Sequence, residues 1–273
     1  KEIIHFLKQT EIQIGIYGEV CDMKILEFGD NSKRKIILIH GFQCPCQVWN
    51  KYIEYYKEKF HIFVPIMSGH NPEIKEDFIS FASDAKEIED YILSRYEKEI
   101  YAVYGMSMGG VLAAVLWQNN RLTFEKVIFD GSPLVSYNSL MKALMKKFYV
   151  DITHKSQKRD KKTVKQATKV IISEDNLEHF LKVLDNMSDA TVKNSIVEIA
   201  DFKLSPSIHT PDTEIYFFHG TAPNEMLARK SAKYICKYYP NTIVKCFKGK
   251  FHCENALFNQ EIMIAELDKI FNN

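Results

Sequence analysis

A serine lies between two glycines in the segment YGMSMGG, where Gly105, Ser107 and Gly109 form the pattern Gly-x-Ser-x-Gly. A serine hydroxyl is a poor nucleophile unless a neighbouring base takes its proton. The apolar run before Ser107 is typical of a buried strand, and the segment after it, GGVLAAVLWQ, is typical of a helix. The pattern therefore predicts a sharp strand–turn–helix that presents Ser107 as a nucleophile, with the glycines leaving room for neighbouring backbone.

His252 is the predicted base for this serine. It follows the last strand-type segment, TIVKCFKGKFH, and precedes the final helical segment. Where a nucleophile sits on such a turn, the chain order is Ser, then acid, then His, and this order favours His252 among the nine histidines. His40 precedes a loop that could donate to an oxyanion, which favours a structural role for it.

Two carboxylates could orient the imidazole of His252. Asp130 follows the apolar run KVIF, and Glu225 follows the segment TEIYFFHGTAPN. The acid more usually follows the strand before the histidine-bearing one, which favours Glu225. Asp130 stays the alternative, although it could instead cap the turn DGSP. Either carboxylate would hold the imidazole tautomer and stabilise the imidazolium.

An oxyanion formed at Ser107 needs preorganised donors. The backbone N–H of Met108, directly after the nucleophile, is one candidate, and the N–H of Phe42 in the loop after IILIHG is the other. Phe42 could also line the acyl pocket. Further candidate pocket residues are Met106 and one face of a predicted helix, for which plain packing is an equal alternative: Met141, Leu144, Met145 and Phe148.

Short β-type runs alternate with helix-type segments along most of the chain, which predicts an α/β fold with a mostly parallel sheet covered by helices on both faces. The run KIILIHGF (35–42) is apolar throughout, as in a strand buried on both faces. Residues 11–20 and 22–30 alternate like an antiparallel hairpin at the leading edge of the sheet. Ligands bind beyond the carboxyl ends of parallel strands, where Ser107, Asp130 and His252 fall. The other predicted strands are 60–70, 99–107, 125–133, 213–221 and 242–252, and the predicted helices are 46–59, 81–97, 108–120, 226–239 and 260–271.

Residues 134–208 interrupt this alternation. They contain no good strand, and their apolar residues recur at helical spacing. We therefore expect a helical cap at 134–208, inserted into a core formed by 1–133 and 209–273. The first half of the insertion is basic and the second half acidic, which is typical of solvated helix faces; a basic rim that attracts anionic substrates is the alternative.

The composition is that of a globular chain, with 46% apolar and 26% charged residues and a formal net charge of +1. This balance gives no general argument for nucleic acid or a membrane surface as partner. The six cysteines are scattered and favour reduced thiols in a cytoplasmic protein. No apolar run is long enough to span a membrane, and no cluster of side chains has the spacing of a metal site. The sequence does not indicate an oligomeric state.

The segments IILIHGF, VPIMSGH, VYGMSMGG, HGTAPNEM and KGKFH occur in the order and spacing of the α/β-hydrolase superfamily, which the chain resembles outside 134–208. The resemblance implies an eight-stranded, mostly parallel sheet, a Ser–acid–His triad and no cofactor. EMLARKSAKYI is similar to the segment that follows the acid in small carboxylesterase-type members, which supports Glu225. The loop GTAPNE is longer than the common Gly-x-x-Asp pattern, and SGHNPE replaces the frequent Gly-His-Gly.

These features predict a serine hydrolase that cleaves carboxylic esters of small to medium acyl groups. A thioesterase, lysophospholipase, acyltransferase, peptidase or carbon–carbon bond hydrolase would use the same machinery, because fold does not fix substrate. A non-catalytic module that binds a small ligand is the alternative from another class, and an intact set of Ser, His and acid argues against it.

Overall fold

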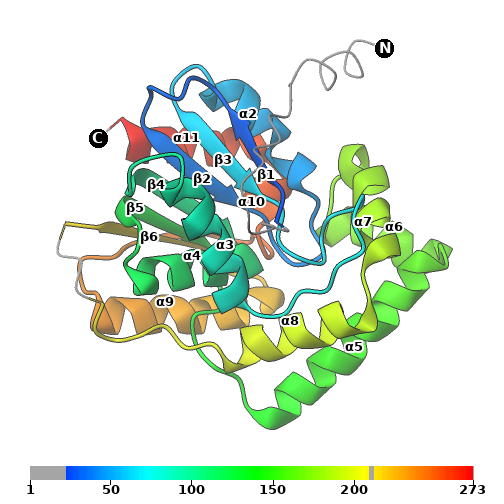
Figure 1. Ribbon diagram of the computed structural model, residues 1–273. Helices are drawn as coiled ribbons and strands as arrows, with labels where there is room; N and C mark the ends of the chain where they lie inside the picture. Colours follow the sequence, from blue (N-terminus) through cyan, green and yellow to red (C-terminus); the bar gives the residue numbers. More distant parts are fainter. Residues whose placement is uncertain (1–22, 209–211, 273) are drawn as a thin grey trace.

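A seven-stranded sheet runs through the residues that the computed structural model describes, 23–208 and 212–272 (Figure 1). The strand order is β1-β3-β2-β4-β5-β6-β7; β1 is antiparallel to β3, and every other neighbouring pair is parallel. The strands are β1 (Ile25–Phe28), β2 (Lys35–Ile39), β3 (His61–Pro65), β4 (Glu99–Met106), β5 (Thr123–Asp130), β6 (Glu214–Gly220) and β7 (Ile243–Phe247).

Helices cover both faces of the sheet, which explains why the central strands are almost continuously apolar. One buried cluster contains Trp49, Tyr52 and Leu267, and the other contains Val111 and Ile235 on the opposite face. The first face is covered by the 3-10 helix η1 (Cys46–Trp49), α2 (Asn50–Tyr56), α10 (Glu254–Phe258) and α11 (Gln260–Phe271). The second is covered by α3 (Phe81–Leu93), α4 (Met108–Asn119) and α9 (Met226–Tyr238).

The predicted fold class is confirmed. Each of the six predicted parallel strands is present, although the strands end earlier than the apolar runs do, for instance at Ile39 in the run 35–42. The second arm of the predicted edge hairpin is β1, while its first arm, residues 11–20, lies outside the described residues. The sheet therefore has seven of the eight expected strands within the described part of the chain.

Between β5 and β6, residues 134–208 contain helices and no strand. Asn138, Asp160 and Ser188 cap three of the helices by accepting from a backbone N–H in the first turn. In Figure 1, α5 and α8 run side by side along one edge of the molecule. None of the helices among the described residues is both long and apolar enough to cross a membrane. The elements are α5 (Ser139–Gln157), α6 (Lys161–Val170), the 3-10 helix η2 (Glu174–Asn176), α7 (Leu177–Asn186) and α8 (Asp189–Asp201).

Gly109 allows α4 to pack directly on β2. A Cβ at this position would lie 2.4 Å from the carbonyl oxygens of both Ile39 and His40, and backbone oxygens cannot rotate away. We expect Gly109→Ala to lower the free energy of unfolding by about 3 kcal/mol, the upper part of the range for overpacking. Urea denaturation followed by circular dichroism measures this loss.

Gly249→Ala is the matched control. Gly249 has φ +79 but nothing within 4 Å of an added Cβ, so the substitution costs only the backbone strain of about 1 kcal/mol. Equal losses in the two variants would contradict the close approach of α4 to β2.

Candidate active site

Ser107 occupies the sharp turn between β4 and α4. Its φ is +53, a left-handed conformation that is strained for a residue with a side chain. A Cβ at Gly105 would lie 2.4 Å from the carbonyl oxygen of Gly109, so both flanking glycines are needed for the turn to close. The strand, turn and helix thus have the local geometry predicted for a nucleophile.

A chain of hydrogen bonds joins Ser107, His252 and Glu225. The Nε2 atom of His252 lies 2.8 Å from the Oγ of Ser107, and its Nδ1 lies 2.5 Å from Oε1 of Glu225. His252 comes from the loop between β7 and α10, and Glu225 comes from the 3-10 helix η3 (Pro223–Glu225) after β6. Parallel strands therefore bring together three groups that are far apart in sequence. This is the arrangement in which a carboxylate orients an imidazole and the imidazole takes the serine proton.

Glu225 is fully buried, and its other oxygen accepts a hydrogen bond from the backbone N–H of Gly220 at 2.7 Å. Burial alone would raise the pKa of the Glu225 carboxyl. The hydrogen bond and charge of His252, together with the Gly220 N–H, outweigh burial and lower that pKa below its ordinary value of 4.5. Glu225 is therefore ionised at neutral pH and stabilises a positive charge on His252.

Asp130, the alternative acid, is not hydrogen-bonded to His252. It is buried at the end of β5, where its Oδ2 accepts a hydrogen bond from the hydroxyl of Tyr104 at 3.0 Å. Burial, and after it the negative charge of Glu225, raises the pKa of Asp130 from 3.8 to about 7. Glu225, the carboxylate that the sequence favours, is thus the one hydrogen-bonded to His252.

The two candidate oxyanion donors belong to segments next to the serine. Met108 is the first residue of α4, so its N–H has no acceptor within the helix. Phe42 and Ser107 line the same cavity, and a Cβ at Gly41 would lie 3.5 Å from the Cβ of Ser107. The loop that carries Phe42 therefore passes directly beside the serine.

Two buried histidines hold this loop. Nε2 of His40 accepts the N–H of Met67 at 3.2 Å, and Nε2 of His70 accepts the N–H of Gln43 at 3.0 Å. Burial lowers the pKa of His40 to about 4 and that of His70 to about 3, so both rings are neutral at pH 7. In a neutral ring whose Nε2 accepts, Nδ1 donates, and each Nδ1 lies beside a backbone carbonyl: Gly41 for His40 and Ser68 for His70.

Gln43 and Gly131 are two residues that sequence reasoning missed. Gln43 has φ +59, and its side-chain amide donates to the hydroxyl of Thr153 in α5 at 2.6 Å, which joins the loop to the helical segment. A Cβ at Gly131 would lie 2.7 Å from Cε1 of His252, so only glycine leaves room for the ring. The turn DGSP after β5 was the available signal for Gly131; nothing local indicated the partner of Gln43.

A cavity of about 110 Å³ opens at Ser107. Its floor comes from the sheet and α10, and Tyr149 of α5 and Ile171 after α6 reach it from the helical segment. The lining residues with polar side-chain atoms are Gln43, Ser107, His252, Tyr149 and the two cysteines, and no lining side chain is a carboxylate or an ammonium. The lining residues are Gly41, Phe42, Gln43, Cys44, Met106, Ser107, Tyr149, Val170, Ile171, His252, Cys253 and Leu257.

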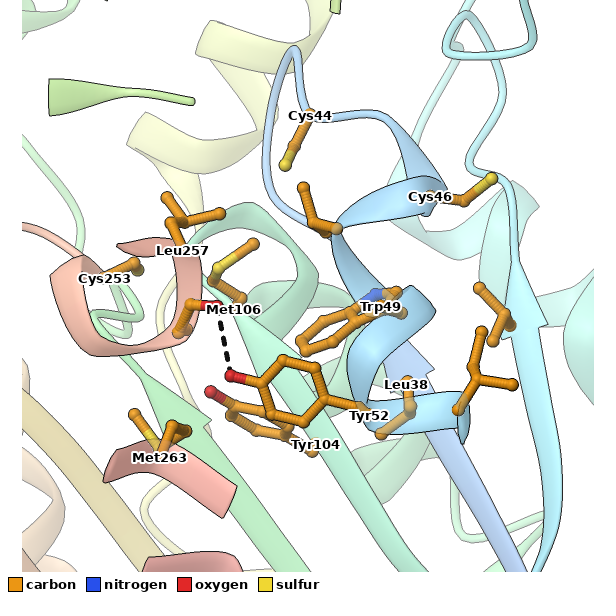
Figure 2. Packing of buried hydrophobic residues seen from close by; sticks show 14 of the residues in the cluster. Leu38, Cys44, Cys46, Trp49, Tyr52, Tyr104, Met106, Cys253, Leu257 and Met263 are labelled. Carbon is orange, nitrogen blue, oxygen red and sulfur yellow. Dashed lines mark hydrogen bonds between the residues drawn. The ribbon is translucent and has the colours of Figure 1, made fainter. Parts of the chain in front are cut away.

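Aromatic packing supports the floor of this cavity. Figure 2 shows Met106 and Leu257 in the same buried cluster as the rings of Trp49 and Tyr52. The hydroxyl of Tyr52 in α2 donates to the carbonyl of Ala256 at 3.0 Å, drawn as a dashed line, and so joins α10 to α2.

Of the predicted pocket residues, some line the cavity and others do not. Met106 lines it, but the expected helical face does not: Leu144 is 56% and Phe148 57% exposed, and neither Met141 nor Met145 lies in the lining. The helix turns the face carrying Tyr149 inward instead. Both faces of this helix carry large apolar side chains, so periodicity could not indicate which one faces the serine.

Solved structures with the same fold cover nearly all of this chain. An α/β-hydrolase family protein from Desulfitobacterium hafniense matches with a TM-score of 0.74 at 14% identity, covering 91% of this chain and 100% of that one. A carboxylesterase structure from Nitrososphaera gargenis matches at 0.71 and 11% identity (92% and 94% covered), and an esterase from Exiguobacterium antarcticum at 0.70 and 15% (92% and 96%). No family model matches the sequence, and no curated protein matches it.

The chain therefore has the α/β-hydrolase fold, as the sequence resemblance implied. The identities of 11–15% establish the fold alone. Among residues 23–208 and 212–272, no group of three His, Cys, Asp or Glu side chains is placed to hold a metal ion.

The raised pKa of Asp130 makes the stability of the fold depend on pH. Between about pH 4 and pH 7 the folded protein keeps a proton on Asp130 that the unfolded chain releases, so this group makes stability fall as pH rises. Asp130→Asn removes the ionisation and keeps an acceptor for Tyr104. As pH rises between these limits, we expect the free energy of unfolding of the variant to increase by about 2–4 kcal/mol relative to that of the original protein. Urea unfolding at several pH values measures this difference.

Glu225→Gln is the control with the opposite sign. In the original protein, the lowered pKa of the Glu225 carboxyl adds stability that is present above about pH 4.5 and lost as pH falls. The free energy of unfolding of the glutamine variant therefore lies further below that of the original protein at neutral pH than in acid. The same pH trend in both variants would contradict the assignment of the two carboxyls.

Proposed function

We propose that the protein is a serine hydrolase that cleaves carboxylic esters with small, uncharged acyl groups. The observation that carries the proposal is the chain of hydrogen bonds from Ser107 through His252 to the buried, ionised Glu225. The fold shared with structures described as esterases is consistent with this chemistry. The cytoplasmic location expected from the sequence is part of the proposal.

Acylation begins when the Oγ of Ser107 attacks the ester carbonyl carbon and Nε2 of His252 takes the hydroxyl proton. The carbonyl oxygen becomes an oxyanion that accepts hydrogen bonds from the N–H groups of Met108 and Phe42. The tetrahedral intermediate collapses as the C–O bond to the alcohol breaks and His252 gives its proton to the leaving oxygen. Glu225 stays ionised throughout and holds the Nδ1–H of His252.

Deacylation repeats these steps with water. His252 takes a proton from the water as its oxygen attacks the acyl carbon, and the second oxyanion forms between the same donors. This intermediate collapses as the bond between the acyl carbon and Oγ breaks, and His252 returns its proton to Oγ, which regenerates Ser107 and releases the carboxylic acid. The side chain of His252 is 33% exposed, so water and the departing alcohol have access to the reacting atoms.

The helical segment 134–208 acts in this proposal as the cap of the active site. Tyr149, Val170 and Ile171 contribute its side of the cavity and so limit the acyl group. The bond from Gln43 to Thr153 joins the cap to the loop that carries the proposed oxyanion donor Phe42.

A fluorophosphonate probe tests the nucleophile. We expect stoichiometric labelling of Ser107, no labelling of Ser107→Ala, and a fall of about 10³-fold or more in ester turnover for Ser107→Ala and His252→Ala. Glu225→Gln also loses activity, since the neutral amide does not stabilise the imidazolium. Hydrolysis of a short p-nitrophenyl ester measures these rates.

Asp130→Asn is the matched control, because its carboxyl is buried nearby but makes no hydrogen bond to His252. We expect labelling and turnover to persist in this variant. Absence of labelling in folded protein, or equal labelling of Ser107→Ala, would refute the hydrolase proposal and favour a ligand-binding role.

The size of the cavity predicts selectivity for short acyl chains. Its volume of about 110 Å³ is smaller than the ~150 Å³ cavity that accommodates benzene, so acyl groups of up to about four carbons fit. We expect kcat/KM to fall steeply from butanoate to octanoate esters. Tyr149→Ala enlarges the cavity and should move the optimum to longer chains, whereas Phe148→Ala, at the next position on the same helix but exposed, should leave it unchanged. An unchanged chain-length profile for Tyr149→Ala would contradict the placement of the acyl group.

A further inference from the structure

An apolar row lies on the outer face of α5. Leu140, Leu144 and Phe148 are 70%, 56% and 57% exposed, and their spacing of four residues places them on one side of the helix. The outward face of a surface helix ordinarily carries polar side chains. We call these three residues the α5 ridge. The proposed hydrolysis does not explain why they are exposed, because α5 lines the cavity through Tyr149 and not through the α5 ridge.

Basic side chains adjoin the α5 ridge. The helix carries four lysines against one aspartate. Lys142 pairs with Asp201 and Lys155 with Asp151, but Lys146 and Lys147 form no ion pair with any residue that the structure describes. Lys147, three residues after Leu144 and likewise exposed, borders the α5 ridge, and Lys146 lies further round the helix. Positive charge that the fold does not neutralise therefore begins at the side of the α5 ridge.

A groove lies next to the α5 ridge on the same helix. Its volume is about 390 Å³, ample for a phosphate group and the atoms attached to it. In Figure 1, α8 runs beside α5, and Lys193 of α8 supplies one lining side chain. The lining residues are Lys146, Lys147, Val150, Asp151, His154 and Lys193.

We propose that α5 docks on an anionic lipid bilayer. The α5 ridge enters the boundary between headgroups and acyl chains, and Lys146 and Lys147 contact lipid phosphates. A helix with an apolar face flanked by lysines binds membranes in this way, by burying apolar surface and by attraction to negative headgroups. This docking goes beyond the proposed hydrolysis and does not depend on it.

Charge and area favour a bilayer over a second copy of the chain. Each ridge side chain offers at most about 150–250 Å², and only part of it is exposed, whereas a stable dimer buries about 800 Å² on each partner. Two α5 helices meeting face to face would also bring together the lysines that have no ion pair, Lys146 and Lys147 of each copy, a like-charge contact that opposes association. An anionic surface provides the opposite charge.

Docking through α5 would also bring the cavity close to the bilayer. Tyr149, which lines the cavity, follows Phe148 directly in the chain and belongs to the same helix. The membrane-facing and cavity-facing sides of α5 are therefore separated by the width of one helix.

Vesicle co-sedimentation tests the docking. Ser107→Ala protein is mixed with phosphatidylcholine vesicles, with or without phosphatidylserine, so that no lipid is turned over. We expect binding to the phosphatidylserine vesicles that weakens with salt and falls by about fivefold for each of Lys146→Ala and Lys147→Ala. The double variant Leu144→Glu, Phe148→Glu should lose at least about tenfold in partitioning.

Ile262→Glu is the matched control, since Ile262 is an exposed apolar residue (47%) on α11 and outside the α5 ridge. Circular dichroism verifies that all variants fold. Equal binding to both vesicle types, equal binding by the double variant, or an equal loss in Ile262→Glu would overturn the proposal. A dimer in sedimentation velocity that the double variant abolishes, without vesicle binding by the original protein, would assign the α5 ridge to self-association instead.

Discussion

The turn at Ser107 is the constraint on which the rest of the site depends. A residue with a side chain is held at φ +53 between β4 and α4, and it stays there because backbone packs against backbone around it. Gly109 lets α4 approach the carbonyls of Ile39 and His40, and Gly105 lets the strand pass beneath the helix. These contacts cannot relax by side-chain rotation, so the strain is maintained by the whole layer of sheet and helix.

Two buried carboxylates next to this turn have different environments and different protonation. Glu225 accepts from Gly220 and lies against His252, and it is ionised; Asp130 has one neutral donor, Tyr104, and holds its proton up to about pH 7. The negative charge of Glu225 itself contributes to the raised pKa of Asp130. Burial alone would disfavour both charges, so the position of the His252 ring decides which carboxyl is ionised.

In the helical segment 134–208, helix α5 has one side at the cavity and another at the surface of the protein. One side of α5 contributes Tyr149 to the cavity and joins the loop after β2 through Thr153 and Gln43. The opposite side carries the α5 ridge, with Lys147 beside it. The same helix therefore limits the size of the cavity and carries the surface that we propose contacts lipid. Neither face includes Ser107, His252 or Glu225, so each can be altered by substitution while these three residues are kept.

The fold class, the order of the elements and the residues at the strand ends were accessible from sequence, because strand–helix alternation and the Gly-x-Ser-x-Gly turn are local patterns. The sequence favoured Glu225 over Asp130, but the hydrogen bond between Glu225 and His252 needed the structure, since it depends on which strand end lies against His252. So did the inward face of α5: the sequence offered Met141, Leu144, Met145 and Phe148 as pocket residues, with plain packing as an equal alternative, and the fold placed Tyr149 at the cavity. The sequence by itself determined which residues can react and which segments carry them. Tertiary structure decided which of them meet, because contact between segments more than a hundred residues apart is set by how helices pack on the sheet, and no local pattern encodes that packing.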